Sequence, residues 1–210
     1  MIEKLKSLIG YVALFFMALS FSIAFTINFT PLYAFDIEYL NIEQMTDMPK
    51  RVLLENYQVI IDYLNFPWIK ELSMPDFPAS ASGLFHFSEV KQLVGWDYVI
   101  FLIATFVSLL FLKKMKEEKG YWKLLNPLRI MIAAPLVALS LIFINFDQLF
   151  IAFHRVFFNN NDWIFDSRTD PIIMALPEEF FMHCFVLVII LIELFLMLLL
   201  SWAKKKVKQA

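Results

Sequence analysis

Apolar residues gather in four long runs along this chain, separated by polar segments. The runs cover residues 8–29, 98–112, 130–153 and 181–202. A helix needs about 20 apolar residues to cross a hydrocarbon core of roughly 30 Å, and the second run reaches that length only with its interfacial neighbours. The pattern predicts an all-α integral membrane protein with four transmembrane helices, in which residues 1–29 supply the N-terminus and the first span.

Residues 30–97 form the longest segment between two runs, and they are too long and too patterned for a simple connector. Asp47 is placed to cap a helix, and Pro49 to occupy its first turn. The apolar positions that follow fall on one stripe: Leu53, Tyr57, Ile60, Ile61 and Leu64. We therefore expect a helical cap with an amphipathic helix that lies on the bilayer or packs on the bundle.

A loop and the start of the second membrane helix are expected further along this segment. Two prolines and the small residues 79–83 indicate an ordered but bendable loop, which His86 follows directly. Ser88 has the side chain of an N-cap, and it predicts a helix that starts near Glu89 and continues into the span at 98–112.

Lys and Arg are concentrated in three places. Two precede the first run, six lie in the connector 113–129 and four lie in the tail 203–210, which together make 12 of the 18. Because positive residues accumulate on the cytoplasmic side of a membrane, we expect both termini in the cytoplasm. The segments 30–97 and 154–180 are then both extracytoplasmic, and two of the three histidines share that compartment.

The composition agrees with a membrane protein and excludes several other classes. Hydrophobic residues make up 60% of the chain, which has 24 Phe and a mean hydropathy of +0.66. A net charge of −2 argues against a nucleic-acid partner. The single cysteine, Cys184, excludes an intramolecular disulfide, a CxxC redox pair and a thiolate zinc site. Low glycine content leaves no phosphate loop or dinucleotide fingerprint.

His154 stands at the outer end of the third run, in a charged setting. Imidazole titrates near neutrality, so a histidine at a membrane edge suits proton transfer. Asp147 lies seven residues earlier on the same helical face, about 10 Å away, which is too far for direct contact. Its candidate partners are Arg155, Lys91 or a backbone group. The alternative for His154 is an interfacial histidine that water satisfies.

The other two histidines and one acid within a span give weaker signals. His86 begins the stretch HFSEVK, and its spacing to Glu89 permits a shared helical face, but HxxE without a further ligand is a weak zinc signal. We expect no metal, and a loop-stabilising role for His86 stays open beside a catalytic one. His183 is expected to be structural. Glu193 could mark a pathway or pair with a polar group of another helix.

Polar residues between the third and fourth runs indicate turns and helix starts. Asp170 and Pro171 have the pattern of a cap and first residue of a short helix, and residues 177–179 repeat it at the start of the fourth span. Residues 159–162 form a turn, and Trp163 suits anchoring at the level of the lipid headgroups.

The chain resembles the Lit family of bacterial membrane proteins, the lipoprotein intramolecular transacylases, in three stretches: HFSEVK, FHRVFFNNNDWIFD and the LPEEFF start of the last span. The resemblance covers the whole layout of the chain. It implies an enzyme of the bacterial cell membrane that moves one acyl chain of a diacylglyceryl-modified lipoprotein from the glycerol sn-2 oxygen to the α-amino group of the N-terminal cysteine, giving the lyso-form. It also implies that the family's two essential histidines are His86 and His154.

The implied chemistry fits the residues. Ester aminolysis within one molecule needs no external acyl donor, metal or other cofactor, and the chain offers a binding motif for none. Two imidazoles can divide the proton transfers and the stabilisation of the oxyanion. His154 is favoured as the general base, and an acyl-imidazole intermediate is the alternative. Six residues are assigned to support of the site or to contact with the lipoprotein and membrane lipid: Glu89, Lys91, Asp147, Arg155, Trp163 and Asp166.

Three other functions stay open at this point. A non-catalytic membrane chaperone or complex subunit would bind a protein through its outer segment and tolerate the loss of either histidine. A small transporter is suggested by Asp147 and Glu193, although inverted repeats and broken helix pairs are missing from the sequence. A membrane lipid-ester hydrolase would use water in place of the amine, and the same two histidines could serve it.

Overall fold

The fold is known from a computed structural model that describes residues 2–209, with every side chain in that range except those of residues 138, 141 and 143. Helices make up all of its regular elements in this range. In chain order they are α1 (Ile2–Asn28), α2 (Thr30–Tyr39), α3 (Ile42–Thr46), α4 (Lys50–Asn65), α5 (Ala81–Glu117), the 3₁₀ helix η1 (Tyr121–Leu124), α6 (Leu125–Ile144), α7 (Phe146–Phe157), α8 (Ile172–Ala175) and α9 (Glu178–Gln209).

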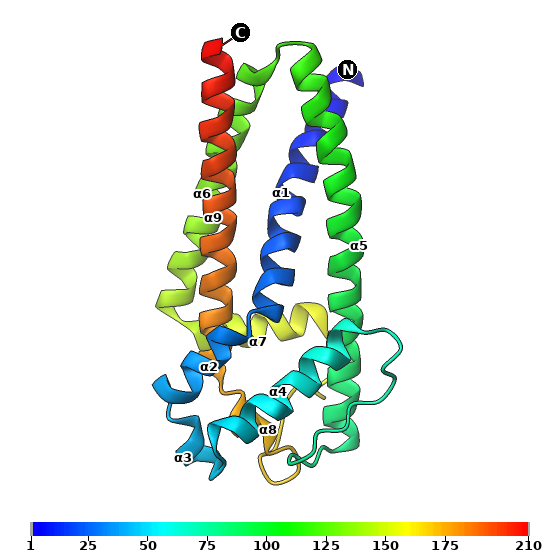
Figure 1. Cartoon of the computed structure of the whole chain (residues 1–210), viewed down its shortest axis with the longest axis vertical. Coiled ribbons are helices and arrows are strands. Elements are labelled where there is room, and N and C mark those ends of the chain that lie inside the picture. Colours follow the sequence, from blue (N-terminus) through cyan, green and yellow to red (C-terminus); the bar gives the residue numbers. More distant parts are fainter. Residues whose placement is uncertain (1, 210) are drawn as a thin grey trace. The chain divides into compact units, whose positions relative to one another are not determined.

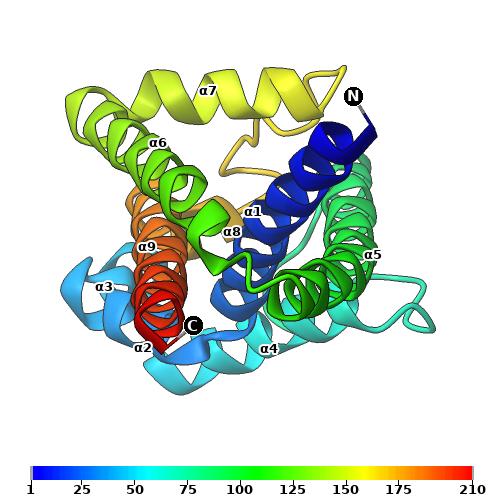
Figure 2. The same cartoon turned by 90° about the horizontal axis from the view of Figure 1, so that it is seen from above.

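The chain divides into two compact units. The first consists of the described parts of residues 1–25, 97–143 and 186–210, and the second of residues 26–96 and 144–185. In the first unit, α1, the C-terminal part of α5, α6 and α9 run side by side (Figures 1 and 2). Their contact surface is a cluster of buried apolar residues: Leu14, Phe111, Met115, Tyr121, Leu124, Leu128, Ile192, Leu196 and Ala203.

Three helices in the described residues are long and apolar enough to cross a membrane, namely α1, α5 and α9. In α5 the apolar stretch is the part from Tyr98 to Leu112, well beyond the start of the helix at Ala81. Many of the large apolar side chains on these helices are exposed, Leu102 and Leu198 among them. Apolar surface of this extent is stable in lipid rather than in water, and the chain is an integral membrane protein.

The second unit packs α2, α4 and α8 around aromatic side chains. Tyr33 of α2 stacks on Tyr57 of α4 with ring centroids 4.2 Å apart, and the Tyr33 hydroxyl donates a hydrogen bond of 3.0 Å to the carbonyl of Ala175 in α8. The apolar stripe of α4 is the face that packs here, since Leu53, Tyr57, Ile60 and Ile61 are all buried. The expectation of an amphipathic helix in this segment is confirmed.

The expected cap of α4 is wrong. Asp47 does not cap this helix; it ends α3 in a left-handed conformation with φ 54° and ψ 33°, and Pro49 is the residue before the first turn. The free backbone N–H of Lys50 finds an acceptor elsewhere, because it donates a hydrogen bond of 2.7 Å to Oε1 of Glu43. Glu43 of α3 therefore accepts the hydrogen bond at the start of α4 that was expected of Asp47.

The expected start of the second membrane helix is also wrong. α5 begins at Ala81, so most of the small-residue run forms its first turn, and Ser88 lies inside it, where its hydroxyl donates to the carbonyl of Phe85. The N-cap is Ser80, whose Oγ accepts a hydrogen bond of 3.0 Å from the N–H of Gly83. This shift places His86 in the second turn of a helix and not in a loop.

The third apolar run is not one helix. α6 ends at Ile144 and α7 starts at Phe146, and between them Asn145 has an extended backbone with φ −163° and ψ 91°. Its side-chain oxygen accepts a hydrogen bond of 3.1 Å from the N–H of Gln148, which caps α7. The expected span 130–153 is therefore broken, and His154 belongs to a separate helix.

Candidate active site

His86 and His154 lie together in the second unit. His86 comes from the second turn of α5 and His154 from the last turns of α7. Their ring centroids are 5.8 Å apart with 37° between the ring planes. Each residue has 8% of its surface exposed. Two imidazoles that are 68 positions apart in the chain thus share one mostly buried site.

Aromatic rings surround both imidazoles. His154 stacks on Trp163 with centroids 4.7 Å apart and lies 4.2 Å from the ring of Phe150. Phe158 meets His86 edge to face at 4.7 Å, and Phe165 does the same at 5.6 Å. Trp163, expected to anchor the protein at headgroup level, is partly buried, with one contact being this imidazole. The packing of these rings leaves little of either imidazole exposed.

The backbone of α7 sets the tautomer of His154. Its Nδ1 lies 2.7 Å from the carbonyl oxygen of Phe150, one turn earlier in the helix. A carbonyl oxygen can only accept, so Nδ1 carries the hydrogen and donates it. Nε2 then keeps a free lone pair, which is the arrangement that a general base requires.

Burial keeps both imidazoles neutral. Desolvation and the neighbouring His154 lower the pKa of His86 from 6.5 to about 4, although the carboxylate of Asp162 opposes the shift. Desolvation also lowers the pKa of His154, against the opposing effect of its hydrogen bond to Phe150. Both rings are consequently uncharged at neutral pH and available to accept a proton.

The turn after α7 fastens the two helices of the site to each other. Nδ2 of Asn160 donates a hydrogen bond of 2.8 Å to Oε1 of Glu89, which is one turn beyond His86 on α5. The backbone carbonyl of Asn160 accepts a hydrogen bond of 3.1 Å from Nε1 of Trp163, the ring that stacks on His154. Ser82 of α5 donates to the carboxylate of Asp162 in the same turn. Sequence reasoning found Glu89 and Trp163 but missed Asn160.

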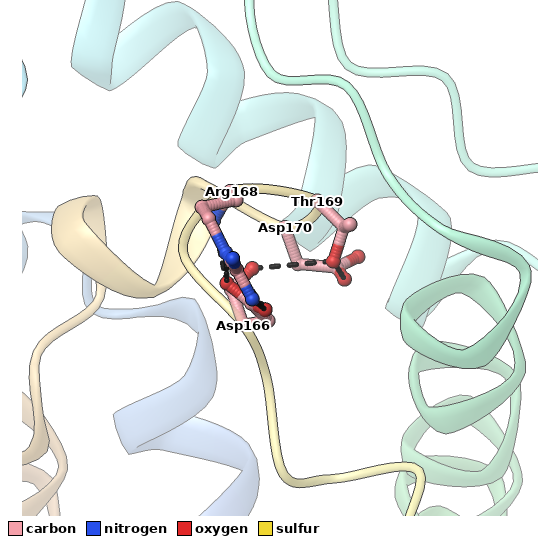
Figure 3. A network of polar contacts seen from close by, with 4 residues as sticks. All are labelled: Asp166, Arg168, Thr169 and Asp170. Atoms are coloured by element: carbon pink, nitrogen blue, oxygen red, sulfur yellow. Dashed lines mark hydrogen bonds and ion pairs between the residues drawn. The ribbon is translucent and has the colours of Figure 1, made fainter.

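Figure 3 shows a second polar connection, in the segment that precedes α8. Arg168 folds over Asp166, and Thr169 donates a hydrogen bond of 2.7 Å to Oδ2 of Asp170. Oδ1 of Asp170 accepts a hydrogen bond of 2.8 Å from the N–H of Ser80, at the start of α5. The short helix expected after Asp170 is present, but this side chain holds α5 and does not cap α8.

The other expected supporting residues make the following contacts. Nζ of Lys91 donates to the carbonyls of Phe66 and Ile69, so this lysine holds a loop and is not the partner of Asp147. Asp147 lies beside the carboxyl of Glu178. Asp166 is exposed and paired with Arg168, and Arg155 is exposed on α7.

Two further expectations concern polar groups away from this site. Nδ1 of His183 lies 2.7 Å from Oδ1 of Asp36, a carboxyl with no exposed surface, which agrees with the structural role expected of this histidine. Glu193 is buried, and neither of its carboxyl oxygens has a hydrogen-bond partner in the part of the chain that is described, so the pairing with another helix is not seen there. Among the same residues no three His, Cys, Asp or Glu side chains are placed to hold a metal ion.

The chain was compared with known proteins. The family model described as lipoprotein intramolecular transacylase Lit matches residues 8–181. The chain is similar to the solved structure of the membrane integral lipoprotein intramolecular transacylase Lit from Bacillus cereus, with 29% identity and a TM-score of 0.94 over 99% of this chain and 97% of that one. Two solved forms of that Bacillus cereus protein carry arginine or alanine in place of one histidine. Each is 29% identical with a TM-score of 0.88, over 99% of this chain and 93% or 94% of theirs. No curated protein sequence matches significantly.

Proposed function

Because the chain belongs to the lipoprotein intramolecular transacylase family, we propose that it transfers an acyl chain within a single bacterial lipoprotein. The acyl chain leaves the sn-2 oxygen of the diacylglyceryl group and joins the α-amino group of the N-terminal cysteine. The product is a lyso-form lipoprotein that is N-acylated and keeps one acyl chain on its glycerol.

The pair of neutral imidazoles carries this proposal. Aminolysis of an ester needs a base that takes a proton from nitrogen and a donor that stabilises the oxyanion. His154 has a free lone pair on Nε2, because its Nδ1–H is held by the carbonyl of Phe150. His86 lies with its ring centroid 5.8 Å from that of His154, close enough for both rings to act on one substrate group.

The proposed reaction proceeds by acid and base catalysis. The substrate nitrogen attacks the ester carbonyl while His154 takes a proton from it, and a hydrogen bond from His86 polarises the carbonyl oxygen. The carbon–oxygen bond to glycerol then breaks, and the departing oxygen receives the proton from His154. An acyl-imidazole intermediate is the competing route, and a trapped acylated histidine would favour it.

Proximity supplies a large part of the rate. Amine and ester belong to the same substrate, so the site needs only to fold that substrate into a reactive geometry. By analogy with intramolecular reactions, this contributes several kcal/mol to the lowering of the barrier. The transfer therefore needs no acyl donor beyond the lipoprotein itself.

The proposed setting is the extracytoplasmic face of the bacterial cell membrane. We propose α6 as a fourth span beside the three found by length and hydropathy, and cytoplasmic placement of both termini by the positive-inside rule. In this proposal the diacylglyceryl group reaches the two histidines from the lipid of the bilayer.

Co-expression with a tagged lipoprotein, followed by tandem mass spectrometry of its lipidated N-terminal peptide, tests the proposal. The transfer is an isomerisation, so intact mass is expected to stay constant while fragment ions show one acyl chain moving from glycerol to nitrogen. Loss of one acyl chain would indicate a hydrolase. An unchanged peptide would favour a non-catalytic membrane partner.

A further inference from the structure

Two buried polar atoms on α5 are left without a partner. Nδ1 of His86 and Oε2 of Glu89 are both buried, and neither has a hydrogen-bond partner among residues 2–209. Positions three apart on a helix lie on the same face, so the two side chains are neighbours. An unpaired buried polar atom costs free energy and is rare in a native protein. An N–H donor would satisfy Oε2 of Glu89, and it would also satisfy Nδ1 of His86 in the tautomer that carries its hydrogen on Nε2.

The orientation of Glu89 is fixed. Its other oxygen, Oε1, accepts the hydrogen bond of 2.8 Å from Asn160. Asn160 is itself fixed, because its side-chain oxygen accepts from the N–H of Asp162 at 3.0 Å and its carbonyl accepts from Trp163 at 3.1 Å. One carboxylate oxygen is thus held by the turn, and the other is left for a ligand.

We propose that Glu89 and Nδ1 of His86 form the subsite that receives the α-amino group of the lipoprotein's N-terminal cysteine. This inference rests on the proposed function. A primary ammonium carries three N–H donors and a positive charge, which match one carboxylate oxygen and one imidazole lone pair. With Nδ1 of His86 accepting, Nε2 carries the hydrogen that polarises the ester carbonyl.

The reaction balances with the amine bound in this way. The ammonium releases one proton to water and a second to Nε2 of His154 as the carbon–nitrogen bond forms. The bond from the acyl carbon to the glycerol oxygen breaks, and the second proton passes from His154 to that oxygen. The amide nitrogen keeps its last hydrogen, and no other reactant is consumed.

Binding of two unreactive analogues to the full-length protein in detergent micelles tests the subsite. Both are lipopeptides with ether-linked chains, one with a free α-amino group and one with an N-acetyl group. We expect the unaltered protein to bind the free amine about tenfold more tightly, as a charge-assisted hydrogen bond would allow. In Glu89→Gln, which keeps the size of the side chain, this preference is expected to fall to about twofold.

Control variants separate the proposal from a structural effect. Glu71→Gln makes the same chemical change at an exposed position and is expected to keep the full preference. Asn160→Ala frees the carboxylate and is expected to lower the preference, and Glu89→Asp, which keeps the charge, is expected to retain part of it if Glu89→Gln does not fold.

A full preference in Glu89→Gln, or equal binding of both analogues by the unaltered protein, would overturn the subsite and leave the transacylase proposal standing. Failure of the unaltered protein to bind either analogue and to isomerise a lipoprotein would instead refute the proposed function, and the subsite with it.

Discussion

Replacement of Gly83 by alanine tests how α5 is held in place. A Cβ atom at Gly83 would overlap Oδ1 of Asp170 and lie 3.1 Å from its Cγ. The carboxylate has little room to retreat, because only 3% of Asp170 is exposed and its oxygens accept hydrogen bonds from Ser80 and Thr169. We therefore expect the bond from Ser80 to break.

The expected loss in the free energy of unfolding is the difference of two effects. A hydrogen bond to a buried charged group contributes about 1.5–3 kcal/mol. Alanine gains up to about 1 kcal/mol over glycine in a helix. Gly83→Ala is therefore expected to lower the free energy of unfolding by about 0.5–2 kcal/mol, and to slow acyl transfer because the same end of α5 carries His86.

Gly95 is the matched control on the same helix. A Cβ atom there would meet nothing within 4 Å. Gly95→Ala is thus expected to raise the free energy of unfolding by up to about 1 kcal/mol. Chemical unfolding in detergent, followed by circular dichroism, gives the two values. Equal effects of the two substitutions, or stabilisation by Gly83→Ala, would refute the role assigned to Asp170.

Three further changes test other parts of the account. Because the pKa of His86 is lowered to about 4, the unfolded chain binds its proton more readily than the folded protein, and this histidine should cost about 3 kcal/mol of stability as pH falls from about 6.5 to about 4. His86→Gln is expected to remove that part of the pH dependence from unfolding curves, and an unchanged slope would contradict the shift. Trp163→Leu removes both the ring that stacks on His154 and the hydrogen bond to Asn160. A fall in kcat of about tenfold with normal circular dichroism is expected. An unaltered kcat would show that the indole does not position the imidazole of His154. Asp36→Asn replaces the carboxyl beside Nδ1 of His183 with an amide and is expected to lower the free energy of unfolding by about 1–2 kcal/mol, as for the weakening of a buried hydrogen bond, whereas a loss below about 0.5 kcal/mol would show that the pair contributes little.

Hydrophobic patterning was a good guide wherever burial of an apolar surface decides the structure. It found α1, α9 and the apolar part of α5, and it found the stripe of α4 that packs on Tyr33. It missed the break at Asn145, because hydropathy averages over one polar residue inside an apolar run. It also placed the start of α5 too late, since the cap at Ser80 depends on Asp170, which lies 90 positions away.

The site could be predicted only in part for the same reason. His86 and His154 were visible as membrane-edge histidines in two motifs that resemble one family. The hydrogen bond from His154 to Phe150 and the contact between Asn160 and Glu89 depend on how distant segments meet. Lys91 was one of three candidate partners for Asp147, and its contacts to the carbonyls of Phe66 and Ile69 could not be predicted, because a long flexible side chain has several acceptors in reach and the sequence does not rank them.

The most direct test of the central claim measures acyl transfer by purified protein in which each site histidine is replaced singly by glutamine. The substrate is a diacylglyceryl lipopeptide, and fragment ions report whether nitrogen has gained an acyl chain. We expect both His86→Gln and His154→Gln to fold and to lose at least about a hundredfold in rate, as for loss of a general acid or base. Transfer at the unaltered rate in either folded variant would contradict the claim that the two imidazoles act together.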